Sequence, residues 1–168
     1  MNISKKKEVP AWRARGYLTQ EEASLPPRDR LEKGPVAVIE CPEKIPCDPC
    51  SEHCPADAIE MKGINEKPGI DFDQCSGCAL CVQHCPGLAI FVLDCSSPGT
   101  CKITIPYELP LPEKGEEVEA LSRKGEKVTT GIVQSITARQ ESAGDTPTAT
   151  VEVPEKYAGT VRNIRRIK

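Results

Sequence analysis

Short apolar runs, bounded by glycine, proline or charged residues, recur along the middle of the chain. The run 36–39 (Val-Ala-Val-Ile) follows Gly34 and Pro35 and is rich in β-branched residues, a pattern that predicts a strand. Similar runs or apolar–polar alternation predict strands at 58–61, 70–73 and 89–93. One helical turn is expected at 50–54 and a short helix at 79–84. We therefore expect an α+β fold over residues 35–105.

Two further apolar runs, 91–93 and 103–105, enclose the turn-forming segment Ser96-Ser97-Pro98-Gly99-Thr100. This pattern predicts a β-hairpin with Cys95 and Cys101 facing each other across its mouth. The two thiols could form a redox-active disulfide. A reducing compartment favours free thiols, and free thiols are the expectation here.

The C-terminal third begins with a proline-punctuated linker, 106–112, of an extended and semi-rigid kind. Strands are expected at 118–121, 127–137 and 148–153, and they suggest a small sheet or an SH3-like barrel. A helix is expected after Pro154, because apolar residues follow at helical spacing and basic residues gather at its end. The apolar residues are Tyr157, Val161, Ile164 and Ile167, and the basic residues are Arg162, Arg165, Arg166 and Lys168. Such a helix would cap the small sheet or dock on a partner subunit.

The first 34 residues are polar and interrupted by Pro10, Pro26 and Pro27, and they predict neither a strand nor a long helix. This extended arm is either disordered or ordered against a partner. Trp12 and Tyr17 favour the second interpretation, because aromatic residues commonly anchor such segments. The predicted organisation is an arm at 1–34, a cysteine-rich domain at 35–105, and a β-rich module with a C-terminal helix at 106–168.

Eight of the ten cysteines fall in two runs of related spacing. The runs are Cys41-x5-Cys47-x2-Cys50-x3-Cys54-Pro55 and Cys75-x2-Cys78-x2-Cys81-x3-Cys85-Pro86. In the second spacing, three thiolates bind one iron–sulfur cluster and the fourth binds a neighbouring cluster. The pattern predicts an iron–sulfur protein with two clusters.

The two runs form an internal repeat. An offset of 31 residues superposes the segment from Cys47 to Ile59 on that from Cys78 to Ile90, whereas an offset of 34 is needed to superpose Cys41 on Cys75. The first run therefore carries a three-residue insertion between Cys41 and Cys47.

Structural zinc is the main alternative, because pairs of thiolates also suit a site of four cysteines. Zinc sites usually place two such pairs on separate knuckles, whereas here four cysteines crowd into one short run, twice. His53 and His84 occupy matching places just before Cys54 and Cys85. Since each cluster already has four candidate thiolates, we expect both histidines at the surface or beside the ligands.

These residues resemble the bacterial dicluster 4Fe-4S ferredoxins over about residues 35–95. The resemblance implies a core of two pseudo-symmetric halves in which the last cysteine of each run crosses to the other cluster. Cluster I would then be held by Cys41, Cys47, Cys50 and Cys85, and cluster II by Cys75, Cys78, Cys81 and Cys54. The five-residue spacer departs from the family pattern, so that without Cys41 cluster I would be a three-iron form or use another ligand.

Six apolar residues are expected to pack around the clusters: Val36, Val38, Ile59, Ile70, Phe72 and Ile90. A core of about 60 residues is too small to be stabilised by burial alone, so iron removal should unfold it. Pro42, Pro46 and Pro49 lack a backbone N–H, whereas Ser76, Gly77 and Ala79 have one. With fewer donors to sulfur, cluster I should have the lower reduction potential.

Charge is unevenly distributed. Residues 35–100 hold three lysines, no arginine and ten acidic residues, which gives a local charge of −7. The flanks are mildly basic. This pattern does not suit a nucleic-acid binder, and it favours docking on a basic redox partner. Neither a secretory signal nor a membrane span is expected, and we expect a cytoplasmic protein.

Nothing else in the sequence resembles an active site, since it has no glycine-rich dinucleotide fingerprint and no nucleophile paired with a base. We therefore expect the chain to carry electrons for chemistry performed elsewhere. It would be a subunit of a larger oxidoreductase, which the long flanking segments favour, or a free-standing ferredoxin. A non-redox, metal-stabilised interaction module is the alternative from another class.

Residues outside the cysteine runs carry a second resemblance. The stretch 30–41 (RLEKGPVAVIEC), the five-residue spacer, 105–108 (IPYE) and 113–115 (EKG) are similar to the small ferredoxin-like subunits that accompany FAD-dependent amino-acid dehydrogenases of anaerobic bacteria. Those complexes are of the proline, hydroxyproline or sarcosine type. The resemblance implies flavin-bearing partner subunits, with FAD in the partner and not in this chain.

Overall fold

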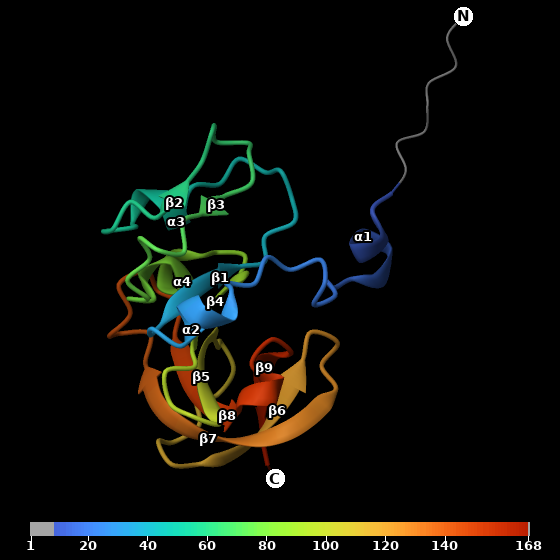
Figure 1. Ribbon diagram of the computed structural model, residues 1–168, viewed down its shortest axis with the longest axis vertical. Coiled ribbons are helices and arrows are strands. Elements are labelled where there is room, and N and C mark those ends of the chain that lie inside the picture. The colour runs from blue at the N-terminus through green and yellow to red at the C-terminus, as the bar shows by residue number, and fades with distance from the viewer. Residues whose placement is uncertain (1–8, 168) are drawn as a thin grey trace, which may run out of the picture.

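The computed structural model describes residues 9–167. A lobe that carries the cysteine runs lies on a larger lobe built from antiparallel sheet (Figure 1). Strands outnumber helices, and the helices are short. The fold is therefore dominated by sheet, and the helical part of the expected α+β fold is limited to short helices.

One seven-stranded sheet has the order β1-β4-β5-β8-β7-β6-β9, and all its neighbours are antiparallel. The strands are β1 (Val36–Ile39), β4 (Ile90–Asp94), β5 (Thr100–Pro106), β6 (Glu117–Ser122), β7 (Lys127–Thr137), β8 (Thr148–Pro154) and β9 (Val161–Arg166). Three of them precede the linker and four follow it. The sheet therefore joins the cysteine-rich segment directly to the β-rich module.

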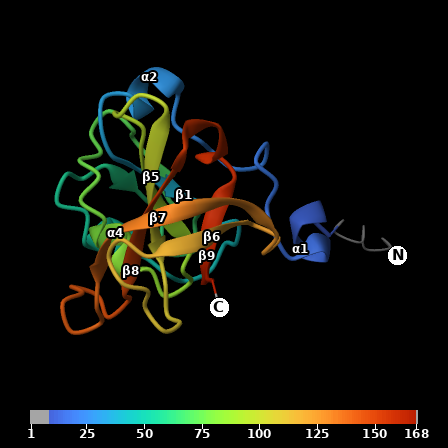
Figure 2. The same ribbon diagram turned by 90° about the horizontal axis from the view of Figure 1, so that it is seen from below.

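The sheet is strongly curled (Figure 2). It encloses one apolar core, to which every strand contributes at least one buried side chain. The largest fully buried residues of this core include Leu93, Ile103, Ile105 and Ile164. Strand β9 also packs against β5 across the curl. The strands expected at 118–121, 127–137 and 148–153 are confirmed as β6, β7 and β8.

The cysteine lobe consists of two short helices and a two-stranded ribbon. These elements are α3 (Pro49–Glu52), β2 (Ile59–Glu60), β3 (Gly69–Ile70) and α4 (Leu80–His84). Helices α3 and α4 pack against each other. A second apolar core lies here, and it includes the buried residues Cys50, Cys81, Val82 and Ile90.

Strand β1 separates the two cores. Ala37 and Ile39 pack in the core of the cysteine lobe, whereas Val38 packs in the core of the sheet lobe. The expectation that Val38 packs around the clusters is therefore wrong. Val36 lies on the same face of the strand as Val38, so the same expectation is wrong for Val36. Since β1 is buried on both faces, an apolar run cannot reveal which face meets which core.

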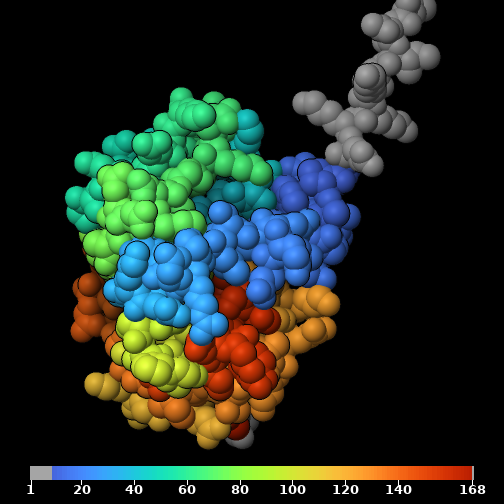
Figure 3. Space-filling view, viewed as in Figure 1, coloured from blue at the N-terminus to red at the C-terminus, as the bar shows by residue number. Residues whose placement is uncertain are grey.

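The arm folds back on the rest of the chain over its described part, residues 9–34. It contains α1 (Ala11–Arg15) and α2 (Arg28–Leu31), and it runs across the junction of the two lobes (Figure 3). The Cys95 amide donates to the Leu31 carbonyl at 3.1 Å, and the Thr160 hydroxyl donates to Gln20 Oε1 at 3.1 Å. Of the two alternatives for the arm, disorder is therefore wrong for this part, whereas contact with a partner is not tested; residues 1–8 lie outside the described residues.

The predicted C-terminal helix is wrong. Glu155–Tyr157 forms one 3₁₀ turn, and Val161–Arg166 forms strand β9. The register shifts where Ser122 pairs with Val161 but Leu121 pairs with Asn163. This bulge makes Arg162 the extra residue and turns Val161 and Ile164, three apart, toward the same core. Because of the bulge, apolar residues of a strand have the spacing expected of a helix.

The hairpin between β4 and β5 is confirmed, with Leu93 opposite Ile103. Cys95 and Cys101 are joined by a disulfide and buried with Ala158. The expectation of free thiols at these positions is therefore wrong. Within residues 9–167, the structure contains no helix that is long and apolar enough to cross a membrane.

Candidate metal centres

Two cavities in the cysteine lobe are each lined by four cysteines. Cys41, Cys47, Cys50 and Cys85 line the first, together with Ile39 and Ile90. Cys75, Cys78, Cys81 and Cys54 line the second, together with Ala37 and Ile59. The last cysteine of each run lies with the first three of the other run. The structure thus brings together the two sets of four that the resemblance assigned to clusters I and II.

The first cavity accommodates the three-residue insertion without losing Cys41. Residues 42–46 form an irregular loop, and the Cys47 amide donates to the Ile64 carbonyl at 3.1 Å, which ties the loop to the segment before β3. Helix α3 then begins at Pro49, a position where a missing N–H is tolerated. Cys41 lines the cavity beside Cys47 and Cys50.

The second cavity is formed by a tight loop between Cys75 and Cys81. Gly77 and Ala79 both have positive φ angles, +69° and +64°. A Cβ atom on Gly77 would lie 2.5 Å from the Pro35 carbonyl oxygen. The loop therefore packs directly on the chain that enters β1, and glycine is required at this position.

Backbone amides point at three of the thiols. Ala37 N–H donates to Cys75 Sγ at 3.4 Å, Ala58 N–H to Cys54 Sγ at 3.3 Å, and Ala89 N–H to Cys85 Sγ at 3.4 Å. Two of these bonds belong to the second cavity and one to the first. Such N–H groups stabilise negative charge on sulfur.

Burial makes several of these thiols hard to ionise unless a metal is bound. It raises the pKa of Cys50 to about 11, with a smaller contribution from the nearby Cys85, and the pKa of Cys81 to about 12, with smaller contributions from Cys75 and Cys78. A bound metal would reverse this penalty, because coordination deprotonates a thiol outright. These cysteines therefore suit permanent metal ligands rather than free nucleophiles.

The number of thiols at each cavity suits a 4Fe-4S cluster. Four thiols line each of the two cavities, and a 4Fe-4S cluster takes four thiolates. The type of donor, the number of thiols and the apolar residues around them therefore fit such a cluster.

The two histidines stack on each other where α3 meets α4. Their ring centroids are 3.7 Å apart and their planes differ by 18°. Burial and the facing His53 ring lower the pKa of His84. Neither histidine is among the residues that line the two cysteine cavities.

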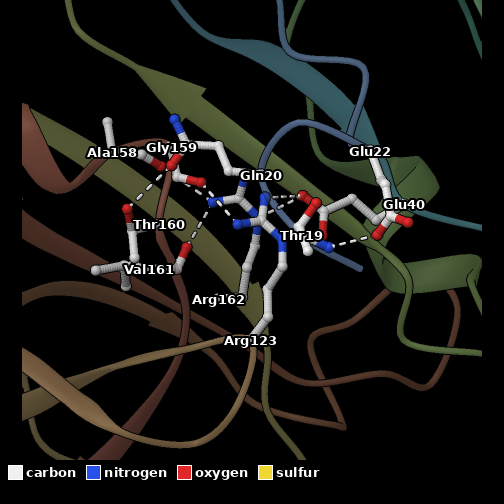
Figure 4. A network of polar contacts seen from close by, with 10 residues as sticks. All are labelled: Thr19, Gln20, Glu22, Glu40, Arg123, Ala158, Gly159, Thr160, Val161 and Arg162. Carbon is white, nitrogen blue, oxygen red and sulfur yellow. Dashed lines mark hydrogen bonds and ion pairs between the residues drawn. The ribbon is translucent and has the colours of Figure 1, made fainter. Parts of the chain in front are cut away.

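Three charged residues beside the first cavity were missed by the sequence analysis. Glu40, which directly precedes Cys41, accepts hydrogen bonds from Arg123 at 2.6 and 2.8 Å and from Arg162 at 2.7 Å (Figure 4). Burial tends to raise the pKa of Glu40, but the two arginines outweigh it and hold the pKa below its ordinary value. The partners lie 83 and 122 residues from Glu40, so no local pattern could have signalled them.

Arg30 was missed in the same way. It lies in the short helix α2 and is only 8% exposed. Its guanidinium donates to the carbonyl of Cys75 at 2.7 Å, beside the second cavity. The arm therefore reaches one of the predicted ligands.

Comparison with known proteins agrees with this geometry. Residues 39–89 match the family model of the 4Fe-4S dicluster domain. The ferredoxin-type protein NapF of Haemophilus influenzae is 44% identical over 54 residues, which are 30% of this chain and 31% of that protein. No solved structure matches the chain. The cysteine lobe is therefore a bacterial dicluster 4Fe-4S ferredoxin domain, and the chain spans about a third of the length of the curated relative it matches.

Proposed function

We propose that this ferredoxin-type electron-transfer protein carries two 4Fe-4S clusters and passes single electrons between a flavin-containing dehydrogenase and an acceptor. Cluster I is held by Cys41, Cys47, Cys50 and Cys85, and cluster II by Cys75, Cys78, Cys81 and Cys54. The observation that carries the proposal is the division of eight cysteines between two cavities, four to each, with the last cysteine of each run crossed over.

When bound, such clusters exchange one electron at a time, and their surroundings tune the potential. The chain supplies those surroundings. Ile39, Ile59 and Ile90 keep water from the two cavities, and the amides of Ala37, Ala58 and Ala89 stabilise charge on sulfur. Cys78 is exposed, so the second site reaches the surface and offers a short path to a docked protein.

The partner is proposed from charge and from the second resemblance. The domain carries a local charge of −7 over residues 35–100, which suits a basic docking face. The partner would bear the flavin, FAD, and oxidise an amino acid or amine, and the complex would be cytoplasmic. A free-standing ferredoxin remains the second candidate, and the acidic lobe alone supports it equally.

The proposal is tested by anaerobic affinity purification from the native host, followed by a visible spectrum and by iron, sulfide and flavin counts. We expect about eight irons per chain, the total for two four-iron clusters, with stoichiometric flavin on a co-purifying chain. A lone chain with the same iron and no flavin would establish the free-standing ferredoxin. Stoichiometric zinc without visible absorbance would contradict the electron-transfer function.

Cysteine variants test the ligand sets. Cys85→Ser should lose or alter cluster I while cluster II keeps its four irons, and Cys54→Ser should do the reverse. The matched control is the double variant Cys95→Ser/Cys101→Ser, since the disulfide lies outside both cavities. If the control loses as much iron as the ligand variants, the assignment is wrong.

A further inference from the structure

Arg30 makes an unusual set of hydrogen bonds at the start of β1. Its guanidinium donates to four backbone carbonyls, those of Phe72 at 2.6 Å, Cys75 at 2.7 Å, Gly34 at 3.1 Å and Pro35 at 3.2 Å. One side chain of the arm thus binds together the chain entering β1 and the segment that leads into the second cysteine run. Arg30 therefore helps to set the position of Cys75.

The charge of Arg30 is not neutralised by these partners. Carbonyl groups satisfy the donors of a guanidinium but carry no net charge. Asp73 and Lys33 line an open cleft beside Arg30, one of each sign. Next to Cys41, Arg123 and Arg162 share the single carboxylate of Glu40, which neutralises one of the two positive charges.

The second cavity lies directly beyond the contact. Cys75 accepts from Arg30 through its carbonyl oxygen, while its thiol sulfur lines the cavity and accepts from the Ala37 amide. A buried charge is screened much less than one in water. The positive charge of Arg30 therefore stabilises negative charge in the second cavity.

We propose that Arg30 is a positioning residue of cluster II that also raises the reduction potential of this cluster. The inference rests on the proposed function. Reduction adds one electron from an external reductant, so the reduced cluster is more negative by one charge and is stabilised more by a nearby cation than the oxidised cluster is. The arm outside the ferredoxin domain thereby favours electron residence on cluster II.

The test is a potentiometric EPR titration with dithionite on the anaerobically purified full-length protein. Its variants are Arg30→Met, Arg30→Gln and Arg30→Lys, and iron is counted in each. Arg28→Met is the matched control, because Arg28 lies on the same helix but is exposed and paired with Glu32 and Glu155. The signals of the two clusters are assigned with Cys78→Ser and Cys47→Ser.

We expect Arg30→Met and Arg30→Gln to lower the potential of cluster II by the equivalent of about tenfold in the reduction equilibrium, 59 mV for one electron. Arg30→Lys keeps the charge and should restore most of this shift although it loses part of the carbonyl contacts. Cluster I should move much less in all variants. Arg28→Met should leave both potentials near the wild-type values.

Unchanged potentials in Arg30→Met and Arg30→Gln, with full iron content, would overturn the inference. If both variants lose cluster II, Arg30→Lys decides: retention of the cluster supports the role of charge, and equal loss shows that only the hydrogen bonds matter. Failure of the proposed function is a separate result, since the wild type itself would then lack two EPR-active clusters.

Discussion

Gly77 shows how one residue can decide whether the second site forms. Its φ angle is +69°, and an added Cβ would lie 2.5 Å from both the Cβ and the carbonyl oxygen of Pro35. Pro35 cannot move away freely, because its carbonyl also accepts from Arg30. Both the backbone conformation and the close packing therefore exclude a side chain here.

We predict that Gly77→Ala loses cluster II. The strained conformation alone costs about 1–3 kcal/mol, and the clash would displace the loop that bears Cys75 and Cys78. Iron content should fall by about half, and the midpoint of thermal unfolding should drop. Gly87→Ala is the control, because an added Cβ there meets nothing within 4 Å. Equal iron content in the two variants would contradict this account.

The roles of some residues could be predicted from the sequence, and those of others could not. The eight cysteines could be predicted as ligands because iron–sulfur ligation imposes a spacing that can be seen in a short stretch of chain. Arg30 and Glu40 could not, since a buried charge is identified by partners that only the folded chain brings near. Arg30 meets Cys75 across 45 residues and Glu40 meets Arg162 across 122.

At the scale of elements, the two sites differ in the backbone N–H groups that donate to their thiols. The amide of Ala37 on β1 and that of Ala58, just before β2, donate to thiols of the second cavity. In the first cavity the Ala89 amide donates to the Cys85 thiol, and weaker backbone contacts from Glu43 and Ser51 act to lower the pKa of Cys41 and Cys50 against the larger effect of burial. These donors are not Ser76, Gly77 and Ala79, which the sequence suggested. Over the described residues, the second cavity nevertheless has more N–H to sulfur hydrogen bonds than the first, as expected.

We therefore predict that cluster I has the lower reduction potential. More N–H donors stabilise the more negative reduced state of cluster II. A potentiometric EPR titration of the wild type, with signals assigned by cysteine variants, measures both values. Equal potentials, or a lower value for cluster II, would show that exposure or other charges outweigh these hydrogen bonds.

Elements were predicted well where one local pattern corresponds to one structure. Strand β7 occupies the predicted residues 127–137, and β1 the predicted 36–39. The C-terminal strand β9 was mistaken for a helix because its bulge spaces Val161 and Ile164 by three. Bulges follow from pairing with a distant strand, here β6, and so a local apolar pattern does not reveal them.

On the scale of the whole molecule, the two cores differ in their relation to the cysteines. The core of the cysteine lobe includes Cys50 and Cys81 and surrounds the two cavities. The core of the sheet lobe is apolar and draws on all seven strands. The sheet can therefore persist when the clusters are lost.

We predict that oxidative removal of iron with a chelator unfolds residues 41–88 and leaves the sheet folded. Amide hydrogen exchange should become fast at Ile59 and Ile70, whose strands pair only in the cysteine lobe, and stay slow at Ile103 and Val151. A sample oxidised without chelator is the control. Fast exchange throughout the chain would instead mean that the two lobes unfold as one unit.

The last prediction concerns how the two lobes are held together. Glu40 follows β1 and precedes Cys41, Arg123 lies in the turn between β6 and β7, and Arg162 lies in β9. All three side chains are less than 10% exposed. The Arg162 guanidinium also lies over the Phe91 ring, 5.2 Å from its centroid. This buried group connects the segment that leads into Cys41 to the module that follows the linker.

Glu40→Gln should destabilise the protein by on the order of 3–5 kcal/mol, because it leaves two buried guanidinium groups without their carboxylate. Arg123→Met should also destabilise it, and the double variant should lose less than the sum of the two, since the charges act as one unit. Denaturant unfolding followed by visible absorbance and by circular dichroism measures the cycle. Glu116→Gln, which breaks an exposed pair with Arg166, should leave the midpoint near the wild-type value. Additive losses would mean that Glu40 and Arg123 stabilise the two lobes separately, and that the contact between them does not support Cys41.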